Sequence, residues 1–159
     1  MSTPSTAAPV RTSVVVEATV QRAFTVFTHD MKAWWPGDHH LLEGELQEMV
    51  FEHRPGGRIY DRATDGRECT WARVLAYEPP ERLVFTWDIS PAWEIETDPD
   101  RASEVEVRFI AESESRTRVE LEHRHLERHG EGWERMQEVV ASPGGWPKTL
   151  GGLAAHLAT

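Results

Sequence analysis

Two segments near the N-terminus differ in the spacing of their hydrophobic positions. Residues 11–19, RTSVVVEAT, are rich in β-branched side chains and predict a strand. The apolar positions that follow recur at the spacing of one helical face, at Val20, Ala23, Phe24 and Phe27. Thr19 stands where an N-cap is expected, so the chain is predicted to begin with a strand and a helix.

From Glu45 to His125, apolar and polar residues mostly alternate, which is typical of half-buried antiparallel strands. Turn signals divide this region, among them RPGG at 54–57 and the hairpin dipeptide Asp65-Gly66. Residues 92–102, AWEIETDPDRA, are expected to form a loop. About six antiparallel strands are therefore predicted, with one face toward water.

A pair of prolines separates two of these strands, in YEPPERLVFTW at 77–87. Neither Pro79 nor Pro80 has a backbone N–H to donate to a strand ladder, so the pair is expected to end one strand and begin the next. The turn also helps to fix the register in which Phe85 and Trp87 face inward.

The C-terminal region returns to the helical period. One apolar stripe contains Trp133, Met136 and Val140, and a second contains Trp146, Leu150, Leu153 and Leu157. Between them, SPGG at 142–145 places Ser142 and Pro143 where an N-cap and a first helical residue are expected. The two stripes stay nearly in phase, which predicts a kinked helix over one surface. The order of elements indicates an α+β fold with this helix laid across the sheet.

Composition narrows the class of protein. The 159 residues suit a single domain at 10–159, preceded by a disordered tail at 1–9. A net charge of −10 disfavours nucleic acid and anionic membranes as partners, and no apolar run is long enough to insert in a membrane. The single cysteine, Cys69, excludes an internal disulfide and is consistent with a cytoplasmic location.

Several motifs together resemble the START-like, helix-grip superfamily, also called SRPBCC, and within it the branch named after the activator of a heat-shock-protein ATPase. They are RAFTVFT (22–28), WWP (34–36), RPGGRIY (54–60), DGRECTWARVLAYEPPERLVFTW (65–87), the EVEVRF and TRVELEH hairpin, and GEGWERM (130–136). The resemblance implies a curved antiparallel sheet of about six or seven strands wrapped around a long C-terminal helix. This sequence departs from the family pattern at ASPGGWP, which interrupts that helix.

The resemblance also implies a cavity between sheet and helix that holds apolar ligands. We expect this chain to bind a small hydrophobic or aromatic molecule there. The alternatives are a chaperone-linked regulatory module of the stress response, with a chaperone or a second copy as partner, and a cyclase- or hydrolase-type enzyme that uses the same cavity.

Large and polar side chains on the inward face are the candidate cavity lining. They are Phe51, His53, Trp71, Arg73, Phe85, Trp87, Leu121, His123, Trp133, Trp146 and Leu150. Tryptophans suit an aromatic ligand, and a few polar groups would orient it. The alternative for each ring is that it fills the core.

No motif in the sequence indicates a specific catalytic reaction. His123 and His125 share a strand face and could meet a metal with His53 or His129, but short histidine patterns are common by chance. General acid–base chemistry by Glu45 or His123 is conceivable, although no established catalytic spacing accompanies either residue. We therefore assign no catalytic residue, no metal and no cofactor, and expect a binding protein rather than an enzyme.

Overall fold

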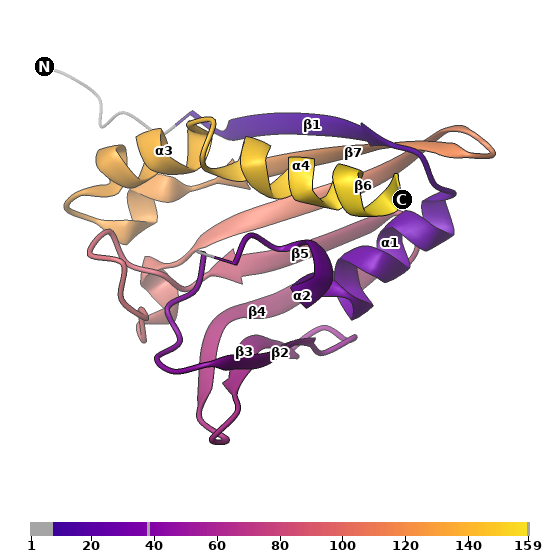
Figure 1. The fold of residues 1–159 in the computed structure, drawn as a ribbon. Helices are drawn as coiled ribbons and strands as arrows, with labels where there is room; N and C mark the ends of the chain where they lie inside the picture. The colour runs from indigo at the N-terminus through magenta and orange to yellow at the C-terminus, as the bar shows by residue number, and fades with distance from the viewer. Residues whose placement is uncertain (1–7, 38, 159) are drawn as a thin grey trace, which may run out of the picture.

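The computed structural model describes residues 8–37 and 39–158, so most of the predicted tail at 1–9 lies outside the described residues. Seven antiparallel strands form one curved sheet in the order β1-β7-β6-β5-β4-β3-β2, and the helices lie on its inner side (Figure 1). The strands are β1 (Val10–Val16), β2 (Leu46–Phe51), β3 (Arg58–Ala63), β4 (Glu68–Glu78), β5 (Arg82–Trp87), β6 (Ser103–Ser113) and β7 (Arg116–Arg124). The predicted helix-grip fold is confirmed.

Local sequence signals account for most boundaries. Helix α1 (Val20–His29) is capped by the Thr19 hydroxyl, which accepts a hydrogen bond from the Arg22 N–H at 3.1 Å. Helix α2 (Met31–Trp34) is the short turn before Pro36. Pro79 and Pro80, joined by a cis peptide bond, separate β4 from β5 as expected.

The C-terminal helix consists of α3 (Trp133–Ala141) and α4 (Trp146–Leu157), which continue in one general direction across the sheet (Figure 1). The predicted kink is confirmed, but the predicted capping by Ser142 is wrong. Ser142 has extended backbone and ends α3, whereas Gly145 precedes α4. A Cβ atom at Gly145 would lie 2.3 Å from the Val140 carbonyl oxygen, so only glycine fits at position 145.

Helix α4 is held at its middle by close contact with the end of α2. A Cβ atom at Gly152 would lie 2.4 Å from the carbonyl oxygen of Trp34, so the absence of a side chain lets the two backbones approach. Leu150, Leu153 and Leu157 are buried on the same helix. The attachment of α4 therefore combines apolar burial with a backbone contact to α2.

The first turn of α4 is tied to the sheet by a buried chain of hydrogen bonds. The Trp146 Nε1–H donates to Nδ1 of His123 on β7 at 3.0 Å, and Ser103 Oγ on β6 lies 2.7 Å from Nε2 of both His123 and His129. Because an indole N–H can only donate, Nδ1 of His123 accepts and its Nε2 carries the hydrogen. The Ser103 hydroxyl therefore accepts from His123 and donates to His129.

This chain requires a neutral His123, and its surroundings favour that form. Burial, assisted by the neighbouring His129, lowers the pKa of His123 from 6.5 to about 3. His123 therefore acts as a neutral acceptor that fixes the position of the Trp146 ring.

Replacing Gly152 with alanine tests the attachment of α4. Gly152→Ala forces α4 away from α2 and is expected to lower the free energy of unfolding by about 1–3 kcal/mol, measured by urea denaturation followed by circular dichroism. Gly151→Ala is the matched control, because a Cβ atom there meets nothing within 4 Å, and better helix propensity should raise stability by up to ~1 kcal/mol. Equal stability of the two variants would contradict the close contact.

The neutral His123 predicts a pH dependence of stability. Since its pKa in the folded protein lies below that in the unfolded chain, its contribution is complete above pH 6.5 and is lost as the pH falls toward about 3. The stability difference between wild type and His123→Gln should therefore shrink, at up to about 1.4 kcal/mol per pH unit. Urea denaturation across that range measures it, and parallel curves for the two proteins would refute the assignment.

Candidate functional site

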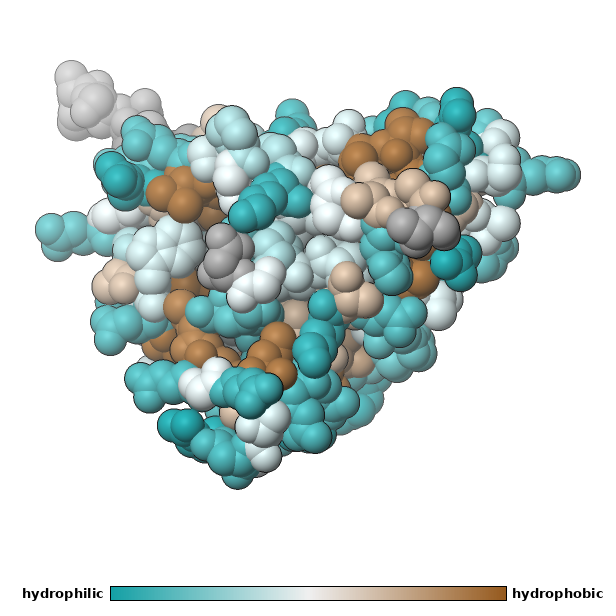
Figure 2. All heavy atoms as spheres, in the orientation of Figure 1, coloured by the Kyte–Doolittle hydropathy of each residue, from teal (hydrophilic) through white to brown (hydrophobic). Residues whose placement is uncertain are grey.

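A cavity of about 360 Å³ opens where the C-terminal helix is broken. Its walls come from the loop after α2, from β3, β4 and β5, from the loop after β5, and from both sides of the α3–α4 break. They are formed by Trp35, His39, His40, Leu41, Asp61, Trp71, Trp87, Ile89, Trp93, Val139, Val140, Gly144, Gly145, Trp146 and Thr149. Figure 2 shows hydrophobic residues reaching the surface among hydrophilic ones on this side, below the C-terminal helices.

Four tryptophans contact one another in a closed ring at the cavity wall. The ring centroids are 5.2 Å apart for Trp35 and Trp71, 6.0 Å for Trp71 and Trp87, 5.3 Å for Trp87 and Trp146, and 6.0 Å for Trp146 and Trp35. Most of these pairs are edge-to-face, and such pairs contribute roughly 0.5–1.5 kcal/mol each beyond area burial. The indoles therefore hold one another in place and form a rigid apolar wall.

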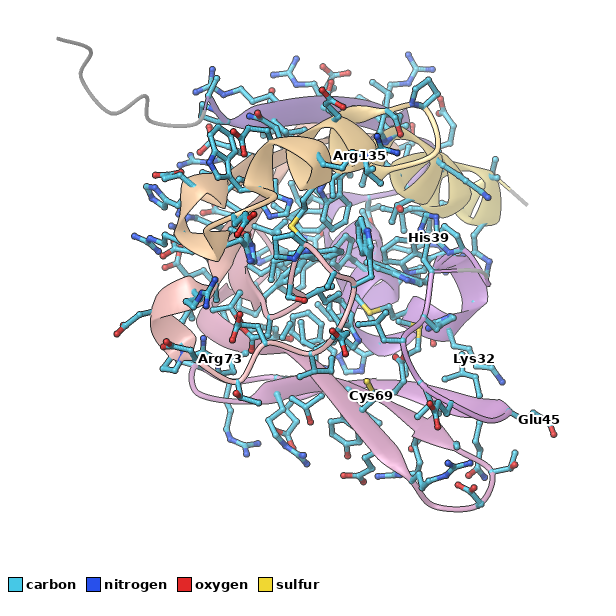
Figure 3. The ribbon with its side chains drawn as sticks, turned by 90° about the vertical axis from the view of Figure 1, so that its left-hand side faces the viewer. Lys32, His39, Glu45, Cys69, Arg73 and Arg135 are labelled. Atoms are coloured by element: carbon cyan, nitrogen blue, oxygen red, sulfur yellow. The ribbon has the colours of Figure 1, made fainter. Side chains whose placement is uncertain are left out.

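A β-bulge aims Trp71 at this wall. In the pairing of β3 with β4, Tyr60 lies opposite Thr70 and Ile59 opposite Ala72, so Trp71 is the extra residue. The bulge changes the alternation, and Arg73 turns to the outside, where Nε and Nη2 bind the Asp88 carboxylate at 3.1 and 3.2 Å. The expectation that Arg73 shares a face with Trp71 therefore fails. Figure 3 shows Arg73 at the edge of the molecule.

A buried carboxylate and an unpaired indole N–H are among the polar groups of this mostly apolar wall. The buried Asp61 carboxylate lies 2.8 Å from His40 Nδ1 through Oδ2 and accepts a hydrogen bond from Trp71 Nε1 through Oδ1 at 3.3 Å. The indole N–H of Trp87 is buried and has no hydrogen-bond partner in the described part of the chain. Because buried donors are nearly always paired, this unpaired N–H is an exception within the wall.

Of the eleven residues expected to line a cavity, Trp71, Trp87 and Trp146 do so. Phe85, Leu121, His123 and Leu150 are buried in the core without lining it, and Trp133 is partly buried at the start of α3. Phe51 and His53 lie elsewhere, near the end of α1. Phe51 packs against Phe85, while the exposed His53 stacks on His29 with ring centroids 3.8 Å apart.

The structure also shows where Glu45 and His125 lie and whether the histidines could form a metal site. Glu45 is exposed and points away from the molecule, so it does not reach the cavity (Figure 3). His125 adopts a left-handed backbone after β7 and does not share a buried face with His123. Within residues 8–37 and 39–158, no group of three or more His, Cys, Asp or Glu side chains could hold a metal ion.

Local patterns in the sequence do not identify the loop residues or Asp61 as cavity lining. His40 lies in the loop after α2, and its contact with Asp61 joins positions 21 residues apart. The one available signal was Asp61 itself, an acid at the alternating position that Ile59 and Ala63 share. Trp93, at the exposed rim, has a positive φ of 60° that no local pattern predicts for a bulky side chain.

Comparisons with solved structures show proteins similar over nearly the whole chain. An anthrahydroquino-γ-pyrone synthase, Txn09, is 42% identical, with 97% of this chain and 99% of that chain covered and a TM-score of 0.67. CalC from Micromonospora echinospora, a self-sacrificing resistance protein, is 29% identical, with 94% and 93% covered and a TM-score of 0.69. NE0264 from Nitrosomonas europaea, at 17% identity and a TM-score of 0.66 over 94% of each chain, shares the fold.

Comparison with curated protein sequences gave no match. No helix among the described residues is long and apolar enough to cross a membrane. The family model described as "Activator of Hsp90 ATPase homolog 1-like protein" matches residues 17–158. This match covers most of the chain and agrees with the helix-grip fold, so the chain belongs to the activator of Hsp90 ATPase homolog 1-like family of START-like ligand-binding domains.

Proposed function

We propose that this protein binds a planar polycyclic aromatic molecule of the anthraquinone class in the cavity at the α3–α4 break. The observation that carries the proposal is the closed ring of Trp35, Trp71, Trp87 and Trp146 at the cavity wall. Indoles stack favourably on flat aromatic ligands, and the mutual packing of the four rings preorganises them.

The size and charge of the cavity favour the same class of ligand. A volume of about 360 Å³ lies in the range of small-molecule sites, roughly 300–1,000 Å³. None of the described lining residues is lysine or arginine, so the site offers no fixed cation to a phosphate or carboxylate ligand. The buried N–H of Trp87 would instead suit a ring carbonyl, as in a quinone.

Two irregular segments would allow a ligand to enter the cavity. The α3–α4 break contributes Gly144 and Gly145, which leave the wall without side chains, and the loop after β5 holds the partly exposed Trp93 at the rim. A rigid aromatic wall with a small-residue opening suits a flat ligand that enters edge first.

The similarity to an anthrahydroquino-γ-pyrone synthase supports an aromatic polycycle as ligand and favours a second candidate function, catalysis on that polycycle. One feature of the site is compatible with catalysis, since the His40–Asp61 pair could exchange a proton with a ligand. The chaperone-linked role and a homodimer stay predictions from the sequence, as does the cytoplasmic location.

Binding of 2-hydroxyanthraquinone, followed by quenching of tryptophan fluorescence, tests the proposal. Gly144→Phe should weaken binding at least about tenfold, a change of about 1.4 kcal/mol, because the added ring fills the opening of the cavity. A Cβ atom at Gly144 meets nothing within 4 Å, so the fold should tolerate the change.

Gly151→Phe is the matched control, since it adds the same ring at an exposed position of α4 away from the cavity. This variant should bind as wild type does. Failure of wild type to bind, or equal binding by both variants, would refute the proposed site.

A further inference from the structure

The His40–Asp61 pair has a defined arrangement of hydrogens. A carboxylate only accepts hydrogen bonds, and each oxygen of Asp61 faces one donor: Oδ2 the Nδ1–H of His40 at 2.8 Å, and Oδ1 the indole N–H of Trp71 at 3.3 Å. With its hydrogen on Nδ1, the neutral His40 ring keeps a lone pair on Nε2, at the edge away from Asp61. A carboxylate that orients an imidazole in this way sets it up as a proton acceptor.

The pair belongs to the cavity and is fixed there. Both side chains line the cavity, Asp61 is buried, and the side chain of His40 is 11% exposed. Trp71 joins the pair to the tryptophan ring, because the indole that donates to Asp61 also packs against Trp35 and Trp87. A ligand bound against the four tryptophans would therefore lie beside His40.

Few other charged or titratable groups compete for this role. Among the described lining residues the ionisable side chains are His39, His40 and Asp61, and Cys69 lies opposite Asp61 across the β3–β4 pairing. Burial and the charge of Asp61 raise the pKa of the Cys69 thiol, so this group stays protonated near neutral pH. The ring of His40 is oriented by a buried carboxylate, which suits it to the role of proton acceptor.

We propose that His40 accepts the proton of a phenolic hydroxyl on the bound polycycle, with Asp61 and Trp71 as positioning residues. This inference rests on the proposed function. In the step, the O–H bond of the phenol breaks, its electron pair stays on oxygen, and the proton forms a bond to His40 Nε2. The products are a phenolate and an imidazolium, and the total charge of the site does not change.

The surroundings favour this charge separation. The imidazolium would lie beside the buried Asp61 carboxylate, which stabilises its positive charge. The phenolate would face the imidazolium in an apolar cavity, where attraction between opposite charges is stronger than in water. The site would therefore convert a phenol into an oxygen nucleophile. The ligand it would take is a hydroxylated aromatic polycycle.

The colour of a bound phenol reports the step directly, because a hydroxyanthraquinone absorbs at longer wavelength once ionised. The pH at which bound 2-hydroxyanthraquinone ionises should lie about one unit or more below that of the free probe in wild type. In His40→Gln it should return to the free value or above, and in Asp61→Asn the shift should be smaller than in wild type. Absorption spectra recorded against pH at saturating protein measure all three.

2-Methoxyanthraquinone, which has no proton to lose, separates binding from ionisation. Wild type and His40→Gln should both bind it, and binding by the variant shows that it keeps its cavity. If both probes bind and wild type and His40→Gln share one ionisation midpoint, the role of His40 is wrong while the proposed binding function stands. If neither probe binds wild type, the proposed function is wrong and this inference falls with it.

Discussion

The attachment of helix α4 to the sheet is the constraint on which the site depends. The helix is fixed at its start by the hydrogen bond from Trp146 to the buried, neutral His123, and at Gly152 by close approach to the backbone of Trp34. These two contacts place the Trp146 ring over the sheet, where it meets Trp35 and Trp87. Since α3 ends at Ala141 and α4 begins at Trp146, Gly144 and Gly145 lie between them and line the cavity together with Trp146.

Polar groups are divided between the two faces of the sheet. On the outer face, Arg124 binds the carboxylates of Glu104, Glu106 and Glu122, so much of the charge of this acidic chain is paired there. The inner face carries the aromatic wall, with the His40–Asp61 pair and the N–H of Trp87 among its polar groups near the cavity. An apolar cavity with few, oriented polar groups is the arrangement that small-molecule sites commonly share.

The periodicity of the sequence was sufficient to predict the fold and three of the cavity residues. Alternation at Trp87 and helical spacing at Trp146 are local signals, and both rings lie where those signals place them. The rest depended on non-local geometry. A bulge at Trp71 reversed the side of Arg73, and the pairing of His40 with Asp61 required a loop to return to a strand. His123 was correctly placed inward, but its role in orienting Trp146 depends on a hydrogen bond between distant elements.

We infer that the four tryptophans at the helix break form a ligand-binding wall and do not only fill the core. Nuclear magnetic resonance of the indole N–H groups tests it most directly, with each tryptophan assigned by single substitution and 2-hydroxyanthraquinone added in steps. The signals of Trp35, Trp71, Trp87 and Trp146 should shift together, with the largest change at the unpaired N–H of Trp87, while Trp133 stays unchanged. Shifts confined to Trp133, or none at all, would contradict it.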